Sequence, residues 1–233
     1  MASLDGKLAA VASTQRFNLY QSVHKGLRAM LCDMLLALGH CDLYEPEQRR
    51  RTLAQLQQVL SLCHCHLQHE DLHLHRAMEA RAPGSSSQRD SEHHHHVGEI
   101  IALQRMADGV NHLPESELDA GGQALYARFS LFVADNFEHM LHEEQDNMAV
   151  LWAHYSDAEL VELHDVLVAG IPADEMAHWF RWIVPHIAHS ERVAMFHGMR
   201  QGMPAEIFAQ HLHAAAELLP AQQARKLQQA LAA

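Results

Sequence analysis

Two short segments of the chain carry histidines and carboxylates at a spacing that suits metal binding. His66 and Glu70 form one His-x-x-x-Glu pair, and His139 and Glu143 form a second pair 73 residues later. Residues four apart on a helix lie on the same face, so each pair can offer one nitrogen and one oxygen to the same ion or to adjacent ions. Imidazole and carboxylate together suit iron or manganese, and the lack of thiolates in these pairs argues against a zinc-finger site or an iron-sulfur cluster.

The same offset relates further residues and indicates an internal repeat. It places His73 over Asp146, and it carries His24 to position 97, beside His96 and within one turn of His93. We therefore interpret the chain as two copies of a helix pair, in which the first helix contributes a histidine and the second contributes a histidine and a glutamate. The candidate metal ligands are His24, His66, Glu70, His93, His96, His139 and Glu143.

Apolar residues at alternating spacings of three and four predict the four helices that position these ligands. The expected ranges are 13–38, 45–81, 91–112 and 123–155, each with one inward-facing stripe that is mainly apolar. The polar positions of these stripes are the ligand positions together with His73, Asn136 and Asp146. Unpaired buried charges are costly, and Lys and Arg are nearly absent from these stripes. A bound cation is therefore the expected counter-charge.

Several of the 22 histidines are expected to lie off the stripes and in solvent. On the second and fourth helices these are His64, His69, His75 and His142. In the tetrahistidine segment, extending the stripe of the third helix backward selects His93 and His96 as ligands, with His96 favoured. The same extension predicts that His94 and His95 are exposed.

Residues 156–233 are predicted to form a C-terminal extension of three or four shorter helices. Ser156 begins a capping box, and Pro185 is expected to kink one of the helices. The histidines of this extension share no stripe with the ligand helices, so metal binding is expected within residues 13–155. The extension is also the candidate surface for a homodimer. Its aromatic residues expected to cover apolar surface of the preceding helices are Trp179, Trp182 and Phe196.

The composition limits the classes of partner. The chain has 233 residues and a net charge of −12, with no Lys/Arg-rich stripe, which argues against nucleic acid and against an anionic membrane surface. No apolar run approaches the roughly 18 residues of a membrane span, and the run near the N-terminus is too short for a secretory signal. We therefore predict a cytoplasmic protein with a small-molecule partner and with its cysteines as free thiols.

As an ordered set, the ligand blocks resemble the hemerythrin-like, HHE cation-binding family. The blocks are His24, then His66-x-x-x-Glu70, then a histidine in "SEHHHHVGEI", then His139-x-x-x-Glu143 in "HMLHEEQ". The resemblance implies an all-α fold, namely an up-down-up-down four-helix bundle with additional C-terminal helices. It also implies a non-haem centre of two iron ions, with manganese as the alternative, bridged by Glu70 and Glu143.

The resemblance leaves the activity open. Oxygen-carrying hemerythrins have two histidines four apart on the third helix, whereas here Val97 follows His93 at that spacing, and they place Asp where Glu144 stands. Both departures are typical of the functionally diverse HHE branch. The implied functions are binding or sensing of O₂ or NO, a di-metal oxidoreductase acting on peroxide or NO or repairing iron-sulfur clusters, and an iron-responsive regulatory protein.

Overall fold

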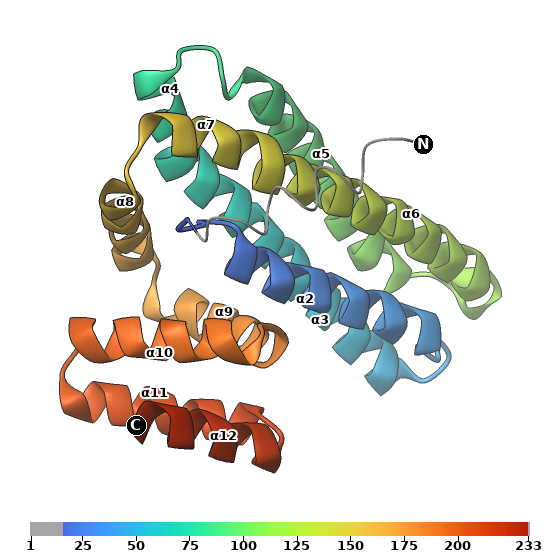
Figure 1. Ribbon diagram of the computed structural model, residues 1–233. Coiled ribbons are helices and arrows are strands. Elements are labelled where there is room, and N and C mark those ends of the chain that lie inside the picture. Colours follow the sequence, from blue (N-terminus) through green and yellow to red (C-terminus); the bar gives the residue numbers. More distant parts are fainter. Residues whose placement is uncertain (1–15, 233) are drawn as a thin grey trace, which may run out of the picture.

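The computed structural model describes residues 16–232, and every regular element in that range is helical (Figure 1). The predicted all-α class is thereby confirmed for the described residues. Among them, no helix is both long enough and apolar enough to cross a membrane. The first elements are α2 (Gln21–His40), α3 (Pro46–His69), η1 (Glu70–His75), α4 (Arg76–Arg81), α5 (Ser87–Val110), α6 (Glu115–His142), η2 (Glu143–Asn147) and α7 (Met148–His154).

Four long helices, α2, α3, α5 and α6, contact one another in a closed ring. α3 contacts both α2 and α5, and α6 contacts both α5 and α2. The space between them is filled by apolar side chains at spacings of three and four, as the sequence predicts. This core includes Leu27, Leu31, Met34, Leu56, Leu60, Ile100, Leu103, Phe129 and Phe132.

Three of the predicted helix starts are wrong. α2 begins only at Gln21, because the Asn18 side chain accepts hydrogen bonds from the backbone N–H groups of Tyr20 and Gln21, both at 2.9 Å. α5 and α6 begin earlier than expected, at Ser87 and Glu115, so the polar connections before them are shorter. The predicted residues 13–15 of the first helix, and the N-terminal apolar run, lie outside the described residues.

The second and fourth helices each contain a π-helical segment, η1 and η2, at equivalent places in the repeat. A π-helical turn holds about one residue more than an α-helical turn, so it rotates the following residues around the helix axis. The stripe predicted beyond these points is therefore wrong. His73 is only partly buried and Asp146 is exposed, whereas Leu74 and Asn147 face the interior.

The C-terminal part contains five helices rather than three or four: α8 (Asp157–Gly170), α9 (Ala173–His186), α10 (His189–Gly202), α11 (Ala205–Leu218) and α12 (Ala221–Ala232). The predicted capping box at Ser156 is confirmed. Pro185 lies in the last turn of α9, which ends at His186. The segment expected to be one kinked helix is therefore two separate helices, α9 and α10. The Arg192 side chain donates hydrogen bonds to carbonyl oxygens at this end, Val184 at 2.7 Å and Ile187 at 2.9 Å.

The C-terminal helices lie against the ring through α9, which contacts α2. The two backbones approach closely at Gly26, where an added Cβ would lie 3.1 Å from the backbone N of Ile183. Trp179 belongs to the core of the ring and Trp182 packs against it, as predicted. Phe196 instead lies in a second core formed by α9 to α12, so the prediction for that residue is wrong.

Candidate metal centre

The structure brings six of the seven candidate ligands together inside the helix ring. They form two overlapping groups, each with ligand atoms within 4.8 Å of one another: His24, His66, Glu70 and Glu143, and Glu70, His93, His139 and Glu143. Each group thus contains two histidines, and the same two carboxylates belong to both. One group draws its histidines from α2 and α3, and the other draws them from α5 and α6.

Glu70 lies between the two groups. Its Oε1 atom is 3.2 Å from His66 Nε2 and 3.5 Å from His24 Nε2. Its Oε2 atom is 3.6 Å from His93 Nε2. The two oxygens of one carboxylate therefore face histidines of different groups, which is the arrangement of a bridging ligand.

Glu143 occupies the corresponding place on the opposite helix. Its Oε2 atom is 3.5 Å from His24 Nε2 and 3.4 Å from His139 Nε2, and its Oε1 atom is 3.5 Å from His93 Nε2. Two ligands about 2.1 Å from one ion and at a right angle lie about 3.0 Å apart. The measured separations are slightly longer, so the ligand atoms surround enough space for cations with little rearrangement.

The centre is closed to solvent and short of hydrogen-bond partners. The side chains of His24 and Glu143 are both 0 % exposed, and that of Glu70 is 3 % exposed. The buried polar atoms at the centre without a hydrogen-bond partner among the described residues are His24 Nε2, His66 Nε2, both Glu70 carboxylate oxygens and both Glu143 carboxylate oxygens. Unpartnered buried polar atoms are rare, and several converging ones indicate a missing ligand. These residues therefore fit a cation.

The electrostatics of the centre favour positive charge. Burial lowers the pKa of His24, but the hydrogen bond with Glu144 and the nearby negative charges of Glu70 and Glu143 outweigh it and raise the pKa to about 9. Burial likewise opposes the charge of His93, whereas Asp71 and Glu143 raise its pKa to about 10. Two neutral imidazoles would satisfy the carboxylates poorly, so protons and metal cations compete for this centre.

Burial and the neighbouring Glu143 raise the pKa of Glu70 to about 7. Burial also acts to raise the pKa of Glu143, but His139, His93 and His24 together hold it below its usual value. The two carboxylates thus share one environment and differ in how readily they take up a proton. A cation between them would favour the charged form of both.

Outer carboxylates hold three of the four histidines by Nδ1. Glu144 Oε1 lies 3.0 Å from Nδ1 of His24. Asp71 Oδ1 is 2.7 Å from Nδ1 of His93, and Glu92 Oε2 is 2.8 Å from Nδ1 of His139. With the Nδ1 proton donated to a carboxylate, Nε2 is left as a lone-pair donor directed at the centre, which is the usual arrangement around a metal-bound histidine.

His96 is buried beside the centre but belongs to neither group. Its ring centroid is 4.8 Å from that of His139, and its Nδ1 has no hydrogen-bond partner among the described residues. Burial, followed by the nearby His139, lowers the pKa of His96 to about 3, so this imidazole is neutral. His94 and His95 are exposed, as predicted.

The prediction for His75 is wrong. Its side chain is buried, because η1 turns it inward, and its ring stacks on that of His93 with centroids 4.7 Å apart. The predicted solvent exposure of His64, His69 and His142 is only partly met, since all three are half-buried.

Sequence reasoning missed the outer carboxylates, although the repeat contains a signal for two of them. Asp71 directly follows Glu70, and Glu144 directly follows Glu143, at the same offset as the ligands. Each of these acids holds a histidine on a neighbouring helix. Glu92 directly precedes His93, but the residue that directly precedes His24 is Val23, so the first helix pair has no acid equivalent to Glu92.

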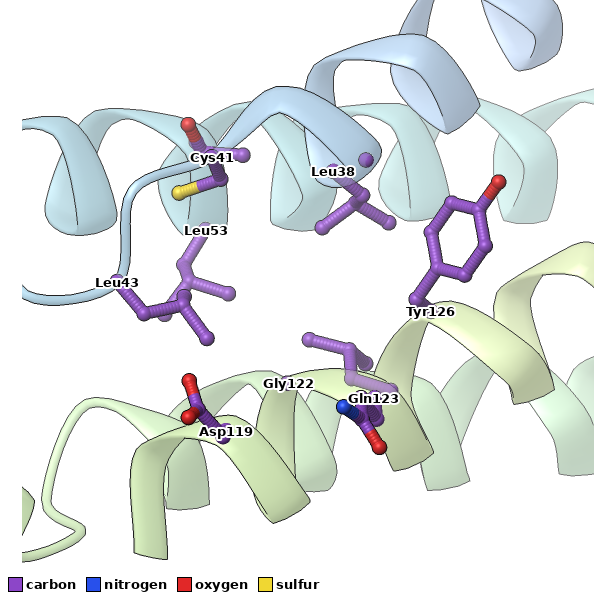
Figure 2. A pocket seen from close by; sticks show the side chains of 11 residues that line it. Leu38, Cys41, Leu43, Leu53, Asp119, Gly122, Gln123 and Tyr126 are labelled. Atoms are coloured by element: carbon purple, nitrogen blue, oxygen red, sulfur yellow. The ribbon is translucent and has the colours of Figure 1, made fainter. Parts of the chain in front are cut away.

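A separate pocket of about 380 Å³ lies near the far end of the helix ring (Figure 2). Its lining includes Leu38, Cys41, Asp119 and Tyr126. Position 38 lies about 21 Å along α2 from His24 at 1.5 Å per residue, so this pocket is not an opening of the metal centre. No group of metal-ligating side chains among the described residues includes a residue of this pocket.

Comparison with known proteins yields no match to a family model, to a curated protein or to a solved structure.

Proposed function

We propose that this chain is a hemerythrin-like protein of the HHE type that holds two iron ions and binds or senses O₂ or NO. The observation that carries the proposal is the pair of overlapping ligand groups, which share Glu70 and Glu143. Two cations would account for buried, unpartnered carboxylate oxygens that lie between two pairs of histidines. The closed ring of α2, α3, α5 and α6 is accordingly proposed to be an up-down-up-down four-helix bundle.

Each residue of the centre has a defined part in this proposal. His24 and His66 hold one ion, His93 and His139 hold the other, and Glu70 and Glu143 serve both. The outer carboxylates orient the imidazoles, and the surrounding apolar core keeps bulk water out. When bound, two iron ions supply the redox chemistry and the vacant positions that a diatomic ligand requires; manganese is the alternative metal.

The number of histidines favours reactivity over reversible carriage. Two six-coordinate ions offer about twelve positions, and four histidines with two carboxylates that each serve both ions fill about eight. His96, the candidate fifth histidine, stands outside both groups. With more positions left for solvent and ligand than in a five-histidine centre, a di-metal oxidoreductase acting on O₂, NO or peroxide is the second candidate function.

Metal analysis of the purified protein tests the proposal. After anaerobic incubation with Fe²⁺ and desalting, we expect about two iron ions per chain. Optical spectra of the reduced protein before and after O₂ or NO then separate reversible binding, in which removing the gas restores the first spectrum, from turnover. One tightly held zinc ion per chain, without iron uptake, would contradict the di-iron assignment.

A further inference from the structure

A second cluster of metal-ligating side chains lies next to the buried centre and opens to solvent. We propose that Asp71, His75 and Asp90, which we call the entry site, bind a divalent first-row cation such as Fe²⁺ or Mn²⁺ and pass it to the centre. The binding of a cation by these residues stands on its own geometry, whereas its transfer inward rests on the proposed function.

At the entry site, one ring nitrogen of His75 contacts both carboxylates. His75 Nδ1 is 2.7 Å from Asp90 Oδ1 and 3.1 Å from Asp71 Oδ1. Two of these residues, Asp71 and His75, form with His93 a group whose ligand atoms lie within 4.8 Å of one another, and Asp90 adds a carboxylate through its contact with His75. One imidazole and two carboxylates are the same ligand types as those of the centre, and they suit the same metals.

The carboxylates of the entry site are partly exposed to solvent, unlike those of the centre, so a hydrated cation can reach them. The side chains of Asp71 and Asp90 are 51 % and 44 % exposed, whereas that of His75 is 4 % exposed. An ion at this site would exchange part of its hydration shell for protein ligands and keep water on its outer side. The buried carboxylates of the centre offer no such first step, because a hydrated ion cannot reach them directly.

The fold does not require an imidazole at position 75. The equivalent residue in the repeat, 73 positions later, is Met148, which is fully buried in apolar surroundings. His75 nevertheless has a buried Nε2 without a hydrogen-bond partner among the described residues. Burying that nitrogen costs free energy that a methionine would avoid. The other ring nitrogen, Nδ1, faces both aspartates, and these contacts indicate the binding role of the histidine.

His93 connects the entry site with the centre. Its Nδ1 is 2.7 Å from Asp71 Oδ1, and its Nε2 is 3.6 Å from Glu70 Oε2. Asp71 and Glu70 are neighbours in the chain, with one carboxylate half-exposed and the other buried. A cation leaving the entry site therefore meets a ligand of the centre at Glu70, the residue just before Asp71 in η1, without crossing the apolar core.

Two variants test the site, each with the full-length protein. Asp90→Asn removes one charged ligand, and His75→Met introduces the residue that the repeat already buries at the equivalent position. Asp108→Asn is the matched control, because Asp108 is an exposed residue on the same helix whose carboxylate accepts a hydrogen bond from Gln57. Mn²⁺ titration followed by electron paramagnetic resonance measures bound ions, and desalting separates retained ions from exchanging ones.

In the wild type and in Asp108→Asn we expect retained ions at the centre and one further, exchanging ion. Asp90→Asn and His75→Met should lose only the exchanging ion, and the retained ions should load at least about ten-fold more slowly, the size of effect typical for outer ligands. Unchanged Mn²⁺ binding in both variants would overturn the entry site, and unchanged loading rates would overturn its role in transfer. If no protein retains ions but the variants lose the exchanging one, the di-metal proposal fails while the entry site stands.

Discussion

At the scale of single residues, the most informative contrast is between two adjacent glutamates on one helix. Glu143 is fully buried and faces histidines of both ligand groups, whereas Glu144 lies outside the centre and contacts His24 Nδ1 and the Arg28 guanidinium. Their side chains differ by one position along η2, and the geometry gives them different tasks. In the proposed centre Glu143 would supply oxygens to two ions, and Glu144 would orient one imidazole.

We expect Glu143→Ala to lose both ions and Glu144→Ala to keep them with weaker affinity. Removing a shared carboxylate strips a bond from each ion, whereas removing an outer partner typically costs about 10- to 100-fold in metal affinity. Iron content after dialysis against graded concentrations of a chelator measures the difference. Glu138→Ala, an exposed glutamate on α6, should behave as the wild type. Equal losses in the variants at 143 and 144 would show that the ligand register on this helix is wrong.

The sequence predicts the His-x-x-x-Glu pairs well, because helical spacing alone places both side chains on one face. In the tetrahistidine segment, the sequence favours His96 over His93 as a ligand because of the repeat offset. The structure instead groups His93 with the two carboxylates. The interval from His93 to His139 is four residues longer than that from His24 to His66, about one helical turn. The offset of 73 residues relates the second helices of the two pairs. Applied to His24 on the first helix, it leads to position 97, four residues beyond His93.

At the scale of elements, periodicity predicts the number and order of the four long helices but not their local geometry. A pattern of apolar residues does not predict a π-helical turn. The segments η1 and η2 begin at Glu70 and Glu143, one turn after the ligands His66 and His139. Their extra residue turns His75 inward and His73 away, which reverses two sequence-based predictions. Because η1 and η2 begin at equivalent positions of the repeat, Glu70 and Glu143, we infer that this distortion serves to place the groups of the centre.

The contact between α2 and α9 provides a prediction at this scale. A Cβ on Gly26 would lie 3.0 Å from Ile183 Cγ1 and 3.1 Å from backbone atoms of Trp182 and Ile183, so Gly26→Ala must push the two helices apart. We expect a loss of about 1 to 3 kcal/mol in the free energy of unfolding, as for other overpacked sites. Urea denaturation followed by circular dichroism measures it.

Gly98→Ala on α5 is the control for that measurement, because a Cβ there meets no atom within 4 Å. Replacing a glycine by alanine inside a helix without a clash stabilises by up to about 1 kcal/mol. The two variants should therefore shift the unfolding midpoint in opposite directions. A stabilising effect of Gly26→Ala would mean that α9 does not lie against α2 at this distance.

At the scale of the whole molecule, the C-terminal helices take part in enclosing the centre. Their histidines contribute no ligand to the groups found among the described residues. The docking of α9 could not be derived from periodicity, because an apolar face does not specify its partner. Trp179 is buried in the core of the ring, and its ring centroid is 5.9 Å from that of His66. The extension thus lies closer to the centre than a separate appendage would.

The Trp179 side chain is held in place by a polar contact that also reaches α3. Its indole N–H donates a hydrogen bond of 2.9 Å to Glu175, whose carboxylate lies 2.9 Å from Nε2 of His69. This network fixes the indole over one histidine of the centre. We therefore expect α9 to limit the access of water or a chelator to that side of the centre.

We accordingly expect Trp179→Ala to release bound iron to a chelator faster than the wild type, by about ten-fold, while the helix content by circular dichroism is unchanged. The expected size is that of removing an outer contact from a metal site. Trp182→Ala is the matched control on the same helix, because Trp182 packs against the ring and stacks on His186 rather than on a centre histidine. If both variants release iron at the same rate, the loss of packing alone explains the effect and the indole does not shield the centre. A faster release confined to Trp179→Ala would make the C-terminal helices a working part of the metal site.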